Sequence, residues 1–156
     1  MKEQAFKFIN QIFINQMFEA DAELAHLLSV DYIVNLDSPN IAEAITLNFE
    51  SQSLTIKTVL EDSTVEFVPG KIEIKSDQKL ISASQNEPWS IAVGKFVGWS
   101  WALINYRGYP DAIQFEFIED RSTKPTIDQE NISPKSIIIQ LIAMDSSLDV
   151  YEVCKV

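Results

Sequence analysis

The sequence predicts an α+β fold, in which a long N-terminal amphipathic helix packs on a curved, mainly antiparallel β-sheet built from hairpins. Two observations lead to this prediction. Apolar residues recur every three or four positions near the N-terminus, and they alternate with polar residues through much of the remaining chain. With 156 residues, the chain has the size of one domain, so we expect a single α+β domain over residues 1–156.

The helical pattern covers residues 5–28, either as one helix or as two with a break near Glu19. Its apolar positions include Phe6, Ile9, Phe13, Met17, Ala20, Leu24, Leu27 and Leu28. In the first half, the apolar face is widened beyond a narrow stripe by Phe8, Ile12, Ile14 and Phe18. This half is therefore expected to be covered by the sheet or used in association.

Short strands follow, bounded by turn residues. We expect a strand at 32–36, a hairpin of 45–49 with 54–58, and a second hairpin of 65–67 with 72–74 around Pro69-Gly70. A polar loop is expected at 76–88 and another at 119–134. Two further hairpins are expected, 98–105 with 113–117 and 137–143 with 148–156.

Charge and cysteine content restrict the partners and the compartment. The net charge of −11 disfavours phosphate backbones and anionic lipids, so we expect no nucleic-acid partner and no membrane partner. The single cysteine, Cys154, cannot form an intrachain disulfide, and the N-terminus lacks the features of a secretory signal. These observations predict a cytoplasmic protein.

Residue types suited to catalysis or metal binding are sparse. The one histidine, His26, falls near the predicted helix end, where a structural role is favoured. Glu19, Glu23 and His26 fit one helix face that could hold a divalent metal, but two ligands from one helix without a recognisable third make a weak metal site, and a solvated face is favoured. Cys154 is interpreted as a packing residue. We therefore expect no catalytic residue, no metal site and no cofactor, although carboxylate pairs leave glycoside-type chemistry open.

The segment 69–110 differs from its acidic flanks. It is slightly basic and contains all four glycines and all three tryptophans of the chain. Tryptophan, tyrosine and arginine dominate binding hot spots, which predicts a recognition surface here. Its candidate residues are Trp89, Trp99, Trp101, Tyr106, Arg107, Tyr109 and Asp111. Trp99 and Trp101 share a strand face, so they are either core residues, which is favoured, or part of this surface. Gly108 is expected to supply a positive φ in the turn.

The run Gly94-Lys-Phe-Val-Gly-Trp-Ser-Trp-Ala-Leu-Ile-Asn-Tyr-Arg-Gly-Tyr-Pro-Asp111, followed by Phe115 and a closing hairpin that ends at 150–153, resembles a family of small bacterial proteins of unknown function. The resemblance covers about the C-terminal half. It implies a bacterial cytosolic α+β domain without an assigned activity.

Two functional hypotheses remain open. In the first, the chain is a non-enzymatic interaction or regulatory module that presents an acidic face or its aromatic turn to a protein partner or, as a homodimer, to a second copy. A special case is a toxin-immunity protein that neutralises a basic nuclease through charge complementarity. In the alternative, a small ligand binds between helix and sheet in a pocket lined by Phe13, Trp99, Trp101 and Phe115, with or without carboxylate-based catalysis.

Overall fold

The computed structural model describes residues 26–50, 52–59, 61, 63–119 and 136–153, apart from the side chains of Trp99 and Trp101. Its elements, in chain order, are β1 (Leu27–Asn35), β2 (Ser38–Phe49), β3 (Ser53–Val59), β4 (Thr64–Pro69), β5 (Gln78–Ser82), α2 (Trp89–Ala92), β6 (Phe96–Ile104), β7 (Pro110–Ile118), β8 (Ile137–Met144) and β9 (Ser147–Glu152).

The first sheet has five antiparallel strands in the order β4-β3-β2-β1-β5. Its register places Tyr32 opposite Ile45, Ile45 opposite Ile56, and Ile56 opposite Phe67. Cross-strand partners lie on the same face of a sheet, so these side chains form one apolar row. Ile45, Ile56 and Phe67 are buried in the core, and Tyr32 packs against it.

The second sheet has four antiparallel strands in the order β6-β7-β8-β9. On β7, Ile113, Phe115 and Phe117 point into the core, and their partners on β8 are also buried. The residues between them, Gln114 and Glu116, therefore point to the opposite face.

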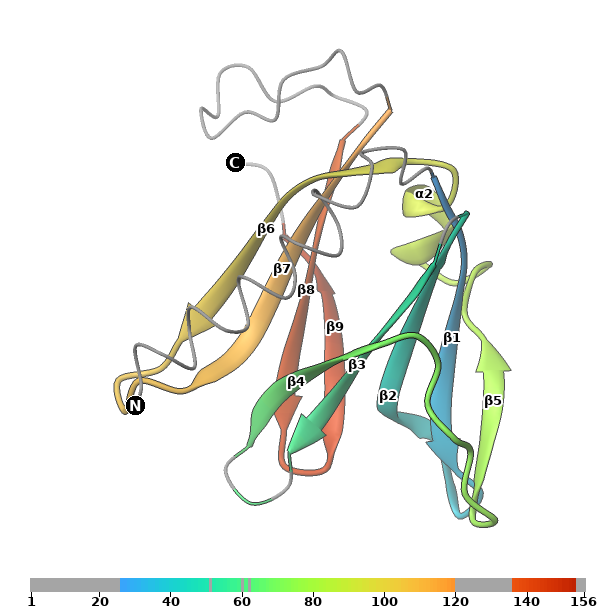
Figure 1. Cartoon of the computed structure of the whole chain (residues 1–156), viewed down its shortest axis with the longest axis vertical. Helices are drawn as coiled ribbons and strands as arrows, with labels where there is room; N and C mark the ends of the chain where they lie inside the picture. The colour runs from blue at the N-terminus through green and yellow to red at the C-terminus, as the bar shows by residue number, and fades with distance from the viewer. Residues whose placement is uncertain (1–25, 51, 60, 62, 120–135, 154–156) are drawn as a thin grey trace.

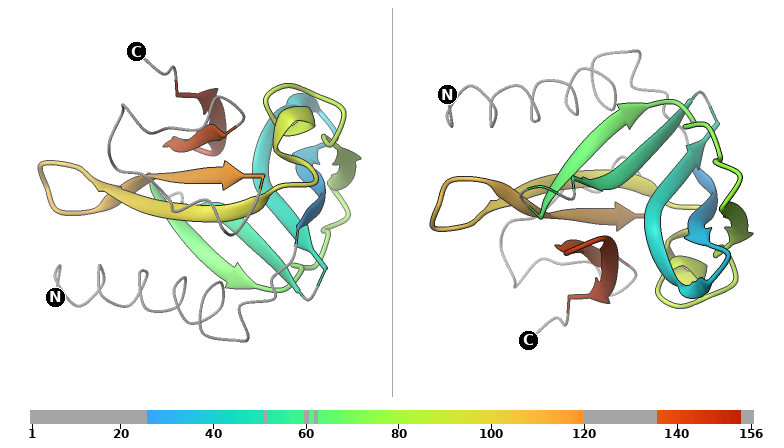
Figure 2. Two further views of the ribbon diagram at one scale, coloured as in Figure 1. Left: turned by 90° about the horizontal axis from the view of Figure 1, so that it is seen from above. Right: turned by 90° about the horizontal axis from the view of Figure 1, so that it is seen from below.

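The two sheets pack on one another and share one hydrophobic core (Figure 1). β2 contacts β9, and β4 contacts β7. The short helix α2 lies at one end of the first sheet and contributes Trp89 and Ala92 to the same core. The β6–β7 hairpin reaches beyond the other coloured strands, as Figure 2 shows from above and below.

The predicted α+β class is wrong. The described residues are mainly β, in two sheets, and their one helix, α2, has four residues. Residues 5–25 of the expected N-terminal helix lie outside the described residues. Its last positions, Leu27 and Leu28, belong to β1, with Leu27 buried and Leu28 exposed. This alternation is that of a strand, whose neighbouring side chains point to opposite faces.

The hairpin of 45–49 with 54–58 is confirmed as β2–β3, and the expected pairs 98–105 with 113–117 and 137–143 with the following strand are confirmed as β6–β7 and β8–β9. The hairpin around Pro69-Gly70 is wrong. β4 pairs with β3, whereas residues 71–77 form no strand and connect β4 to β5. The expected loop at 76–88 contains β5, which pairs with β1 and owes its strand geometry to that distant partner.

Candidate functional site

The β6–β7 turn is held in one conformation by Asn105. The Asn105 side-chain oxygen accepts hydrogen bonds from the backbone N–H of Arg107 (2.9 Å) and of Tyr109 (3.1 Å). The backbone N–H of Asn105 donates to the Tyr109 carbonyl (2.9 Å), and the N–H of Gly108 donates to the Asn105 carbonyl (2.8 Å). Gly108 has φ of 85°, which confirms the expected positive φ and explains why glycine suits this position. The turn is therefore a preorganised loop.

Aromatic and basic side chains lie at the tip of this hairpin. Tyr106 is 92% exposed, Arg107 is exposed, and Tyr109 is 40% exposed. The Arg107 Nε donates a hydrogen bond to the Tyr106 hydroxyl (3.1 Å), and the guanidinium carbon lies 5.6 Å from the centroid of the Tyr106 ring. Tyr106 and Arg107 thus form a joined cationic and aromatic surface, which we call the tip surface together with Tyr109.

The other predicted recognition residues do not all join this surface. Trp89 is fully buried in the core, where its ring meets Phe117 edge-on at a centroid distance of 6.3 Å. Asp111 is half-buried near the start of β7. The backbones of Trp99 and Trp101 pair with Glu116 and Gln114, but their side chains are not described, so the choice between core and surface stays a prediction.

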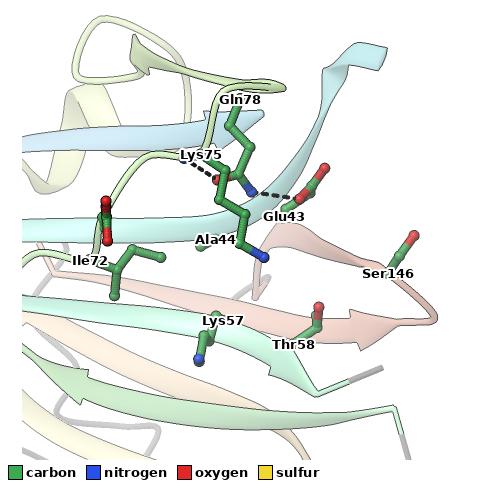
Figure 3. Close-up of a pocket in the computed structure, with 9 residues that line it drawn as sticks. Glu43, Ala44, Lys57, Thr58, Ile72, Lys75, Gln78 and Ser146 are labelled. Carbon is green, nitrogen blue, oxygen red and sulfur yellow. Dashed lines mark hydrogen bonds between the residues drawn. The ribbon is translucent and has the colours of Figure 1, made fainter. Parts of the chain in front are cut away.

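A second candidate is an open cleft of about 340 Å³ at the first sheet (Figure 3). It is lined by Glu43 and Ala44 of β2, Lys57 and Thr58 of β3, Ile72, Glu73 and Lys75 of the connection 71–77, Gln78 of β5, and Ser146 of the β8–β9 turn. Sequence reasoning missed this cleft, since its residues come from distant parts of the chain. The residue pattern of any single segment does not indicate such a site.

Polar contacts fix several side chains of the cleft. The Gln78 side-chain amide donates to Glu43 Oε2 (2.8 Å) and accepts from the backbone N–H of Lys75 (3.1 Å). Lys57 Nζ lies 3.5 Å from Glu66 Oε2, its cross-strand neighbour. In Figure 3 the Lys75 side chain extends into the space between Gln78 and Thr58.

Of the four residues expected to line a ligand pocket between helix and sheet, Phe115 is the one whose side chain the structure describes, so that pocket stays a prediction. Phe115 is fully buried between the two sheets, with its ring centroid 6.2 Å from that of Phe117. Phe13 lies outside the described residues, as do Glu19, Glu23 and Cys154.

His26 directly precedes β1. Its Nδ1 is 3.0 Å from Glu50 Oε1, and its ring stacks at a tilt on Phe96 with centroids 4.1 Å apart. Among the described residues, no cluster of three or more His, Cys, Asp or Glu side chains is arranged to hold a metal ion. The described part of the chain likewise contains no helix with the length and apolarity needed to cross a membrane.

Two tyrosines have shifted acidities. Burial raises the pKa of Tyr32 above its ordinary value of 10.0, and the hydrogen bond from Trp89 opposes part of this rise. The neighbouring Asp149 carboxylate raises the pKa of the exposed Tyr151, whose hydroxyl donates to Asp149 Oδ2 at 3.2 Å. Both tyrosines lie outside the tip surface and the cleft.

No curated protein and no solved structure matches the chain. One family model does match, and it covers residues 14–156. The family resemblance therefore extends over nearly the whole chain, and the expectation that it covers only the C-terminal half is wrong. On this match, the chain belongs to a family of unknown function (DUF6334).

Proposed function

We propose that the chain is a non-enzymatic protein-interaction module that contacts its partner through the tip surface of the β6–β7 hairpin. The observation that carries this proposal is the exposure of Tyr106, which is 92% exposed at the end of a hairpin that extends beyond the rest of the fold. A large aromatic ring in this position contributes nothing to the core. It is available for burial by another molecule.

The composition of the tip surface fits a binding hot spot. Tyrosine and arginine are enriched among residues that cost about 2 kcal/mol or more when truncated in an interface. Arg107 is already oriented by the Tyr106 hydroxyl, and Asn105 holds the backbone beneath both. Because the loop is preorganised, less conformational entropy is lost on binding than for a flexible loop.

The charge of the chain supports a basic partner. A net charge of −11 attracts cationic proteins over long range and raises their association rate. The specific form of the proposal is a toxin-immunity-type pairing in the cytoplasm, in which the acidic body steers a basic nuclease and the tip surface docks on it. Association with a second copy of the chain is the competing outcome.

The test compares the immobilised wild-type protein with Y106A/R107A as baits for proteins of the native host. We expect a basic protein to be retained by wild type and its affinity to fall about tenfold or more in the double variant. Y151A is the matched control, because Tyr151 is also exposed but lies on β9. The retained protein should bind more weakly as salt rises from about 0.05 M to about 0.5 M.

Equal retention by wild type and Y106A/R107A would overturn the proposal. If the retained basic protein binds equally well at low and high salt, the charge-steered form of the proposal is overturned. Light scattering of the free protein measures whether it forms a dimer. A dimer that is lost in Y106A/R107A but kept in Y151A would show that the tip surface binds a second copy of the chain instead of a foreign partner.

A further inference from the structure

The cleft at the first sheet contains opposite charges that the described fold does not use. Among the described residues, neither the Lys75 ammonium group nor the Glu73 carboxylate forms an ion pair. Both line the same cleft and both belong to the connection 71–77. A protein surface gains little stability from isolated charges, so these two groups are available to a ligand.

Beside them, the polar frame of the cleft is already ordered. Gln78 is held at both ends of its amide, by the Lys75 backbone N–H and by Glu43. Glu43 is half-buried, lines the cleft and accepts the Gln78 hydrogen bond with one of its two carboxylate oxygens. Thr58 and Ser146 add hydroxyl groups from β3 and from the β8–β9 turn, as Figure 3 shows. A ligand would meet these groups without a large rearrangement.

An apolar surface completes the cleft. Ala44 is buried on β2, and Ile72 is half-buried on the connection that runs beside it. The volume of about 340 Å³ is at the lower end of small-molecule pockets, which span ~300–1,000 Å³. The ligand class is therefore a small metabolite with a short aliphatic part.

The charge arrangement decides between anionic, cationic and zwitterionic ligands. A simple anion attracted by Lys75 would lie near Glu43 and Glu73, and a polyanion would be repelled more strongly. A simple cation would meet the Lys75 ammonium group. A molecule with one carboxylate and one ammonium group satisfies both signs, with its carboxylate toward Lys75 and its ammonium group toward the glutamates.

We propose that this cleft binds a small zwitterion of the α-amino-acid class, through Lys75, Glu43 and Glu73, with its aliphatic side chain over Ile72. This site is separate from the tip surface. The ligand proposal can therefore be tested independently of the proposed protein-interaction function.

The test uses the full chain, labelled with ¹⁵N, and follows the Gln78 side-chain amide by NMR. L-leucine is the probe, and two analogues each lack one of its charges: 4-methylpentanoate lacks the ammonium group, and 3-methylbutan-1-amine lacks the carboxylate. We expect L-leucine to shift the Gln78 resonances with a Kd of about 1 mM or tighter, and each analogue to bind about tenfold or more weakly.

Two variants locate the charge contacts. K75Q should weaken L-leucine binding about tenfold but strengthen the weak binding of 3-methylbutan-1-amine, because the amine is repelled by the Lys75 ammonium group and makes no favourable contact with it. K71Q is the matched control, because Lys71 lies on the same connection, is exposed and does not line the cleft. The proposal is overturned if L-leucine leaves the Gln78 resonances unshifted, if the analogues bind as well as L-leucine, or if K75Q behaves like K71Q.

Discussion

The indole Nε1 of Trp89 donates a 2.6 Å hydrogen bond to the hydroxyl of Tyr32. This contact joins α2 to β1 across 57 positions of the sequence. Trp89 is fully buried, and a buried indole N–H needs an acceptor because its desolvation is otherwise uncompensated. The Tyr32 hydroxyl thus allows Trp89, the largest of the fully buried side chains that the structure describes, to enter the core from α2.

Removing that acceptor should destabilise the fold. We expect Y32F to lower the free energy of unfolding by about 1–3 kcal/mol, the cost of leaving a buried donor without a partner. Urea unfolding followed by tryptophan fluorescence and by circular dichroism measures this change. Y151F is the control, because that exposed hydroxyl should matter by less than about 0.5 kcal/mol. Equal stability of Y32F and Y151F would contradict the role assigned to the Trp89–Tyr32 contact.

Stability should also depend on the ionisation of Tyr32 at alkaline pH. Burial raises the pKa of the folded-state phenol above 10.0, so above about pH 10 the unfolded chain loses this proton while the folded chain keeps it. Unfolding then releases a proton, and the contribution of Tyr32 is complete below pH 10 and is lost as the pH rises toward the folded-state pKa.

The slope of this loss is at most about 1.4 kcal/mol per pH unit. Urea midpoints measured at several pH values above 9 should fall more steeply for wild type than for Y32F. Y106F is the control, since it removes an exposed phenol and should follow the wild-type curve. Parallel curves for wild type and Y32F would show that the fold does not discriminate between the two forms of Tyr32.

The hairpins were predictable where the alternation of apolar and polar residues along each strand matches the pairing of buried residues across the two strands. Ile45 and Leu47 pair with Ile56 and Leu54 across a short polar turn, and all four are buried. The Pro69-Gly70 dipeptide, by contrast, indicates a turn but not which strand the following residues pair with. Gly70 has φ of 80°, but the chain then passes on to β5 and does not return along β4.

The candidate sites likewise differ in whether their residues are close together in the sequence. Tyr106, Arg107 and Tyr109 are neighbours in one turn, so sequence reasoning could group them before their exposure was known. The cleft brings together β2, β3, the connection to β5 and the β8–β9 turn, and only the sheet order makes them adjacent. The α+β class failed for a related reason, since a two-sheet core depends on which strands pair across long distances.

A buried threonine pair offers a test of hydrogen-bond direction. Thr55 Oγ1 donates to the Gly70 carbonyl (2.8 Å) and lies 2.9 Å from Thr46 Oγ1. A hydroxyl has one proton, so Thr46 must donate to Thr55. T55V removes this acceptor and should cost about 1–3 kcal/mol, because the Thr46 donor is left buried.

The double variant T46V/T55V should be less destabilised than T55V alone, because it also removes the orphaned donor. Urea unfolding of T46V, T55V and the double variant measures this coupling. T46V should cost less than T55V, because Thr55 still donates to the Gly70 carbonyl, and equal costs would contradict the assigned direction. A double variant that costs the sum of the two single changes would contradict the Thr46–Thr55 hydrogen bond itself.

Close packing at Gly98 on β6 sets a limit on the size of that residue. A Cβ atom at this position would lie 3.1 Å from Ile118 Cγ2 and 3.3 Å from Ile118 Cδ1 on the neighbouring strand. Overpacking costs about 1–3 kcal/mol, which exceeds the ~0.4–1 kcal/mol gained when alanine restricts the unfolded chain. We therefore expect G98A to be destabilised, measured as a lower urea midpoint. If the clash with Ile118 is the cause, G98A/I118A should cost less than the sum of G98A and I118A, because the second change removes two of the three contacting atoms and leaves only Glu116 Oε1, at 3.3 Å. Strict additivity would place the cost of G98A elsewhere than at Ile118.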